Sequence, residues 1–211
     1  RDQLHQAIRD PDPLVAMHAI PHFSYRREVM TPEHVEAALE HPNDQVKMSA
    51  LKWAIDSMEH DQDRRRWSAR SRQNMNIDHL LTKAITSGSE VVREHLAGRP
   101  DLLTDEHVFQ ILQHSQPEYS HEYERFNKSG QMETAKQQKY GVITRIHEPF
   151  FNTGVTYGKE PMAEFKRRVT PEMMQRVQQS DPEKITKVHE ILTQRFGGSS
   201  QLRRAMGGDP S

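Results

Sequence analysis

Apolar side chains recur along the chain at intervals of three and four residues, which is the pattern of an amphipathic helix. After Asp44, for example, apolar residues stand at Val46, Ala50, Ala54 and Met58. Short breaks that contain Pro, Asp, Ser or Gly interrupt this pattern repeatedly. The sequence therefore predicts short helices joined by tight turns.

One phrase typical of a helix N terminus occurs three times. It consists of Thr, then Pro or Asp, then Glu, and the copies begin at Thr31, Thr104 and Thr170. Thr is a good N-cap, Pro at the first helical position loses no hydrogen bond, and Glu is favoured in the positively polarised first turn. His34 and His107 occupy the same place in two of the copies. We expect three equivalent helix starts.

The chain also repeats at the level of helix pairs. The first two pairs align at an offset of 31 residues, with Leu4 on Val35, Pro11 on Pro42 and Val15 on Val46. A degenerate pair follows at 77–96 and a last one at 171–196. Since one such pair cannot bury its apolar faces alone, the pairs must stack. We predict an all-α fold, a HEAT-like α-solenoid (armadillo-type superhelix) with a helical insertion.

Two segments resemble a known family. They are residues 31–51 and the stretch Val92-Arg93-Glu94-His95-Leu96-Ala97-Gly98-Arg99-Pro100-Asp101-Leu102-Leu103-Thr104. Both are similar to the variant leucine-rich repeat family, an all-helical relative of HEAT repeats, and the likeness extends over 1–57, 74–118 and 170–196. The resemblance implies a scaffold that displays a curved binding surface. Some members carry an iron–sulfur cluster on a cysteine-rich segment, and this chain has no Cys to hold one.

The repeat pattern defines the expected domain organisation. Residues 1–118 form helical repeats with an Arg-rich insertion at about 59–74, and residues 119–169 form an aromatic helical insertion. Residues 170–198 form the final repeat, and 199–211 a flexible tail. Because the sequence starts at Arg1 rather than Met, we expect a trimmed chain or part of a longer one.

The Arg-rich insertion is the first candidate binding site. Five arginines lie within nine positions and surround Trp67: Arg64, Arg65, Arg66, Arg70 and Arg72. Arg binds phosphate or carboxylate with a bidentate fork and stacks on aromatic rings, so this cluster can hold a nucleic acid or an acidic partner. The alternative is a solvated helix whose arginines pair with the neighbouring carboxylates Asp56, Glu59, Asp61 and Asp63.

The aromatic insertion is the second candidate site. It holds eight of the chain's twelve Phe and Tyr residues. We predict helices at about 118–127, 131–148 and 160–168, with an exposed turn at 151–158. Phe150, Phe151 and Tyr157 are the candidate contact residues, because aromatic side chains dominate binding hot spots. The alternative is that these rings pack the insertion against the repeats.

Charge and composition exclude several classes of function. The 29 basic and 30 acidic residues give a net charge of −1 over 211 residues, which does not favour nucleic-acid binding driven by net charge. No Cys means no disulfide, thiol nucleophile or cysteine-held cluster. No apolar run is long enough to span a membrane. We expect no membrane association and a cytoplasmic location, with a phage particle as the alternative.

Catalytic and metal-binding motifs are also missing. Thirteen His residues are present, but none is placed with a second and third ligand as catalytic zinc requires, so we predict no metal site and no cofactor. The sequence has no nucleophile elbow, phosphate-binding loop or dinucleotide fingerprint. We predict no catalytic residues.

The prediction is a non-enzymatic helical-repeat scaffold for protein–protein interaction, whose partner is another protein bound on the concave face or on the 119–169 insertion. Two alternatives stay open. One is a nucleic-acid-binding HEAT-like protein or DNA glycosylase-like enzyme that uses the Arg cluster. The other is a structural component of a bacterial or phage assembly.

Overall fold

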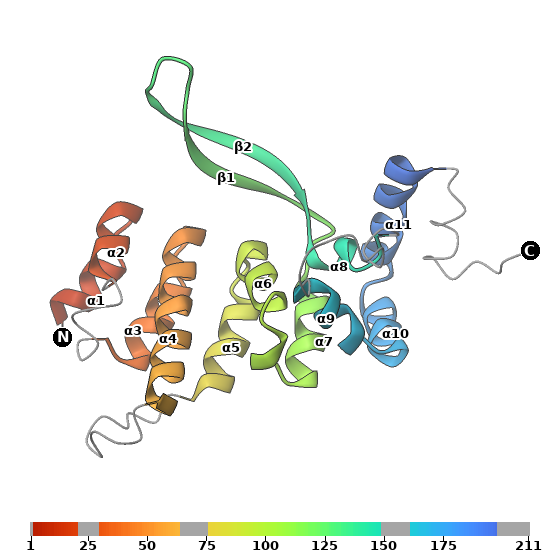
Figure 1. Ribbon diagram of the computed structural model, residues 1–211, viewed down its shortest axis with the longest axis horizontal. Helices are drawn as coiled ribbons and strands as arrows, with labels where there is room; N and C mark the ends of the chain where they lie inside the picture. Colours follow the sequence, from red (N-terminus) through yellow and green to blue (C-terminus); the bar gives the residue numbers. More distant parts are fainter. Residues whose placement is uncertain (1, 21–29, 64–75, 149–160, 198–211) are drawn as a thin grey trace, which may run out of the picture. The chain divides into compact units, whose positions relative to one another are not determined.

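A computed structural model describes residues 2–20, 30–63, 76–148 and 161–197. Within these ranges the protein is mostly helical and contains one two-stranded antiparallel sheet (Figure 1). The chain divides into two compact units, residues 1–92 and 93–211. In the described part, every helix is too short or too polar to cross a lipid bilayer.

The first unit consists of paired helices. Its elements are α1 (Asp2–Ile8), α2 (Pro13–Ala19), α3 (Pro32–Leu39), α4 (Asp44–Asp63) and α5 (Ile77–Thr86), and α6 (Glu90–Ala97) begins at its end. Helix α1 packs against α2 and α3, α2 against α4, and α3 against α4 and α5. The expected apolar stripes form the core, since Val35, Val46, Ala50 and Ala54 are buried.

The second unit surrounds α7 (Asp105–His114). It also contains η1 (Pro100–Leu102), β1 (Glu118–Phe126), β2 (Met132–Tyr140), α8 (Val142–Arg145), α9 (Pro161–Arg168), α10 (Pro171–Ser180) and α11 (Pro182–Phe196). Helix α7 contacts α8, α9 and α10, and α11 contacts α8 and α10. Phe165 of α9 is fully buried and fills this core.

All three predicted helix starts are confirmed. Helices α3, α7 and α10 begin directly after Thr31, Thr104 and Thr170. At Thr104 the cap is reciprocal, because the His107 amide donates to Thr104 Oγ1 and the Thr104 amide donates to His107 Nδ1, both at 3.2 Å. The amide of Thr31 donates to His34 Nδ1 in the same way, at 3.0 Å. A buried imidazole thus takes the place of the Glu or Gln of the usual capping box.

The prediction of an all-α chain is wrong at the aromatic insertion. The expected helix at 118–127 is strand β1, and the expected helix at 131–148 is strand β2 followed by the four-residue helix α8. Glu, Lys, Gln and Arg are good helix formers, and their abundance here misled the prediction. The expected helix at 160–168 is present as α9.

Candidate interaction site

Every site residue predicted from the sequence lies outside the described residues. This applies to the Arg-rich cluster and to the aromatic turn alike: Arg64, Arg65, Arg66, Trp67, Arg70, Arg72, Phe150, Phe151 and Tyr157. The described part of the aromatic insertion is the hairpin of β1 and β2, which we call the arm.

The arm is a regular antiparallel ribbon. Nine residue pairs join its strands, from Glu118 opposite Tyr140 at the base to Phe126 opposite Met132 at the far end. At about 3.4 Å per residue the ribbon is roughly 30 Å long. It extends away from the helices of the second unit (Figure 1). An isolated two-stranded ribbon is only marginally stable in water, so its base must be held by the helices.

Backbone and hydroxyl groups fix the base of the arm between α7 and α8. The amide of Gly141 donates to the carbonyl of Pro117 at 3.0 Å, and the Thr144 hydroxyl donates to the same carbonyl at 2.6 Å. The Ser115 hydroxyl accepts the amide of Ile143 at 3.0 Å. Ser115 and Thr144 are completely buried, so these bonds are shielded from water.

A carboxylate on α6 provides a second anchor. Glu94 accepts the Tyr119 hydroxyl at 2.5 Å on one oxygen and the Arg145 guanidinium at 2.7 Å on the other. Tyr119 is the second residue of β1 and its side chain is buried. Hydrogen bonds to a carboxylate are stronger than those between neutral groups, and Glu94 thus ties both sides of the arm's base to one helix.

Helix α11 contacts the base through two cations. The Arg195 guanidinium carbon lies 5.0 Å from the centroid of the Tyr140 ring, and its Nη1 is 3.0 Å from Glu148. Lys187 Nζ lies 3.7 Å from the Glu118 carboxylate. Glu118 and Tyr140 are the pair of opposite residues at the base of the arm, and α11 contacts both of them.

The middle of the arm is charged and balanced. Glu122 pairs with Lys136 across one face at 2.7 Å, and Arg125 with Glu133 across the other at 2.8 Å. Each ion pair raises the pKa of its cation, chiefly through the hydrogen bond to the carboxylate. Charged side chains along a strand discourage pairing with a further strand. These charges therefore disfavour the addition of a further strand to the middle of the arm, which we call the shaft.

A tight turn closes the arm. The Asn127 side chain accepts the amides of Ser129 and Gln131 at 3.0 and 2.9 Å, and the amide of Gly130 donates to the Asn127 carbonyl at 3.0 Å. Gly130 has φ of +77°, the left-handed conformation that glycine adopts without strain. Asn at the first position and Gly at the fourth are the residues that such a turn favours.

The tip carries two large apolar side chains in water. Phe126 is 72% exposed and Met132, directly opposite, is 55% exposed. Their side chains point to the same face of the ribbon, since residues opposite each other in a sheet share a face. Of the residues whose side chains are described, only Leu14 and Val15 of α2 are comparable large apolar residues left exposed.

Phe126 falls within the helix expected at about 118–127, but it is the last residue of strand β1. The sequence feature that could have predicted the hairpin is the turn Asn127-Lys128-Ser129-Gly130, which lies between the two nine-residue strands. Tyr119, His121 and Tyr123 alternate at period two, and the rings of the last two stack with centroids 6.0 Å apart.

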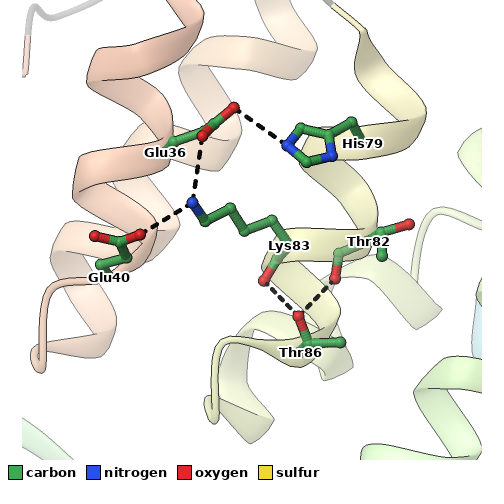
Figure 2. Close-up of polar contacts among 6 residues, drawn as sticks. All are labelled: Glu36, Glu40, His79, Thr82, Lys83 and Thr86. Carbon is green, nitrogen blue, oxygen red and sulfur yellow. Dashed lines mark hydrogen bonds and ion pairs between the residues drawn. The ribbon is translucent and has the colours of Figure 1, made fainter.

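The most connected polar cluster of the first unit joins α3 and α5. Lys83 binds Glu36 at 3.2 Å and Glu40 at 3.0 Å, and His79 lies 3.3 Å from Glu36 (Figure 2). The hydrogen bond to Glu40 raises the pKa of Lys83, and the same contact lowers the pKa of Glu40. Partly exposed ion pairs of this kind contribute only modestly to the contact between two helices.

No three His, Asp or Glu side chains within the described ranges converge as metal ligands. Comparison with protein-family models, with curated proteins and with solved structures finds no match to this chain. The exposed Phe126 and Met132 at its tip make the arm the candidate site.

Proposed function

We propose that this protein is a non-enzymatic helical-repeat scaffold that binds another protein through the tip of the arm. The helix pairs would stack as a HEAT-like α-solenoid, and the arm would present its tip at a distance from them. The observation that carries the proposal is the Phe126–Met132 pair, exposed at the end of a ribbon whose base is fixed by buried hydrogen bonds.

Two physical reasons favour a protein partner. Exposed apolar side chains that gather at one place mark contact surfaces, and Phe and Met are enriched in protein interfaces. The shaft is charge-balanced, whereas a ribbon that binds nucleic acid needs a surplus of Lys and Arg to bind phosphates. A fixed base lowers the entropy lost on binding, because the tip is already held in place.

Site-specific photocrosslinking tests this proposal. A photoreactive benzoylphenylalanine replaces Phe126 in the full chain, and a matched control carries it at Gln138, which is exposed on the same face of the ribbon nearer the base. After irradiation in an extract of cells that encode the chain, we expect discrete protein adducts from position 126 only. Adding Met132→Asp should remove them. Equal labelling from positions 126 and 138 would contradict the proposal.

A further inference from the structure

The first unit contains a second exposed apolar patch. Leu14 is 61% exposed and Val15 is 41% exposed, at the start of α2. We call residues 10–15 the α2 patch. A helix of a globular protein usually turns its large apolar side chains inward, as Ala16 does in the next position. The exposed pair therefore indicates a contact surface.

The α2 patch is acidic beside its apolar residues. Asp12 caps α2 by accepting the Leu14 amide at 2.9 Å, and Asp10 accepts the Asp12 amide at 2.9 Å. These are the only charged residues of the patch. Arg9 precedes the patch and is also exposed. Asp12 lies next to Leu14, and Asp10 lies next to Asp12.

The turn of the arm carries one charge, and it is positive. The turn residues 127–131 contain one charged side chain, Lys128, which is exposed. Of the neighbouring strand charges, Arg125 and Glu133 form an ion pair at 2.8 Å, and Glu124 precedes Arg125 on β1. The tip thus combines two apolar side chains with a cation, and the α2 patch combines two apolar side chains with two carboxylates.

We infer that the arm tip of one copy of this protein binds the α2 patch of a second copy. The inference rests on the proposed function and names the partner as this chain itself. Phe126 and Met132 cover Leu14 and Val15, and Lys128 faces the carboxylates of Asp10 and Asp12.

The symmetric alternatives are less favourable. A tip-to-tip dimer places Lys128 against its own copy and leaves Leu14 and Val15 exposed. A dimer of two α2 patches brings four carboxylates together and leaves Phe126 exposed. Like charges in contact disfavour both arrangements. Pairing the tip with the α2 patch is the arrangement that matches charges and covers all four apolar side chains.

Such a contact joins two different surfaces, and each molecule supplies one tip and one α2 patch. The product is a closed pair in which each tip binds the other copy's α2 patch, a larger ring, or an open chain of subunits. The area is small, and contacts of this size are weak, with a Kd between about 10 µM and about 1 mM. Association should therefore depend strongly on concentration and weaken with added salt.

Sedimentation velocity of the full chain tests the inference, over a range from about 5 to about 500 µM at low ionic strength. The wild type should form dimers or larger species as its concentration rises. Phe126→Ser and Leu14→Ser should each remain monomeric. Gln138→Ser, a control on the same face as the tip, should associate like the wild type. Circular dichroism checks that all variants are folded.

Mixing the two monomeric variants gives the decisive result. Phe126→Ser keeps its α2 patch and Leu14→Ser keeps its tip, so an equimolar mixture should form dimers and nothing larger. A monomeric wild type overturns the inference, as does a Leu14→Ser variant that still associates alone. If the wild type is monomeric while position 126 crosslinks to a different protein, the inference fails and the proposed function stands.

Discussion

The imidazole of His41 bonds to the backbone carbonyl of Asp10, with 2.9 Å between Nε2 and the oxygen. These residues are 31 positions apart, the offset between the first two helix pairs. The Asn43 amide donates to Nδ1 of the same ring at 3.0 Å. Because an amide N–H only donates and a carbonyl only accepts, Nδ1 is the acceptor and Nε2 the donor in these two hydrogen bonds. The turn of the second pair is thus bonded to the equivalent turn of the first.

Replacing this ring should loosen the first unit. His41→Leu removes both hydrogen bonds and leaves the Asp10 carbonyl and the Asn43 amide without them, at a cost of about 1–3 kcal/mol. Hydrogen exchange of α1 to α4 measures the loss of protection. His18→Leu, an exposed His of α2, is the matched control and should change little. Equal effects of the two substitutions would show that the bond between the turns contributes nothing.

The capping imidazoles give a second prediction. His107→Ala removes the acceptor for the Thr104 amide at the start of α7, and the loss of a cap interaction costs about 1 kcal/mol. His107→Gln can still accept this hydrogen bond, so it should keep more of the stability. The free energy of unfolding in urea separates the two variants. Identical losses would mean that packing of the ring, and not capping, is what matters.

Local signals predicted the helices and failed at the arm. Thr, Pro and Glu act on the helix that they start, so Thr31, Thr104 and Thr170 could be identified from neighbouring residues alone. The arm depends on contacts across the ribbon, such as Glu122 with Lys136 and Arg125 with Glu133. On a helix these pairs would be too far apart in sequence to meet. These charged residues resemble the solvated face of a helix in sequence, but they lie on the two faces of the β-hairpin.

The contacts that anchor the candidate site were even harder to predict from the sequence. Glu94 meets Tyr119 and Arg145 only because α6, β1 and α8 converge, and the sequence separations are 25 and 51 residues. The spacing of neighbouring residues in the sequence does not predict such long-range contacts. The tip was identifiable in principle, since the Asn127 to Gly130 turn determines which residues end the strands.

The Glu94 anchor yields a third prediction. Glu94→Gln removes the charge that holds the Tyr119 hydroxyl and the Arg145 guanidinium, at a cost of about 1–3 kcal/mol for hydrogen bonds to a charged group. We expect faster amide exchange in β1 and β2, with the largest change near the base. Glu190→Gln, an exposed residue of α11, serves as the control. Unchanged exchange in both strands would assign the anchoring to the other contacts at the base, those of Ser115, Thr144 and α11.

The turn of the arm gives a fourth prediction. A Cβ at Gly130 would meet no atom within 4 Å, so Gly130→Ala creates no clash and only imposes a left-handed conformation on a side-chain-bearing residue. That costs roughly 1–2 kcal/mol. Asn tolerates this region better, so Gly130→Asn should cost less. Nuclear Overhauser contacts between Phe126 and Met132 report whether the tip stays closed. Equal disruption by both residues would contradict a purely conformational cause.

The second unit should lose stability in mild acid because of His147. Burial holds the pKa of this imidazole below its usual value, and electrostatic interactions with His189 and Lys166 act in the same direction. Its hydrogen bond to the Ile143 carbonyl, with Nδ1 2.7 Å from the oxygen, opposes them. Burial also lowers the pKa of His114, which lies near Arg93 and Lys184.

The sign of the pH dependence follows from linkage. As the pH falls below about 6.5, the unfolded chain takes up a proton at position 147 before the folded chain does. The stabilisation is therefore complete above this pH and is lost as the pH falls through the folded pKa. Urea unfolding at pH 7.5 and pH 5 should show a drop that His147→Gln reduces and His18→Gln leaves unchanged. Since His114 contributes with the same sign, part of the drop should persist in His147→Gln. If the unfolding free energy fell as much between pH 7.5 and pH 5 in His147→Gln as in the wild type, His147 would be ruled out as a source of the pH dependence.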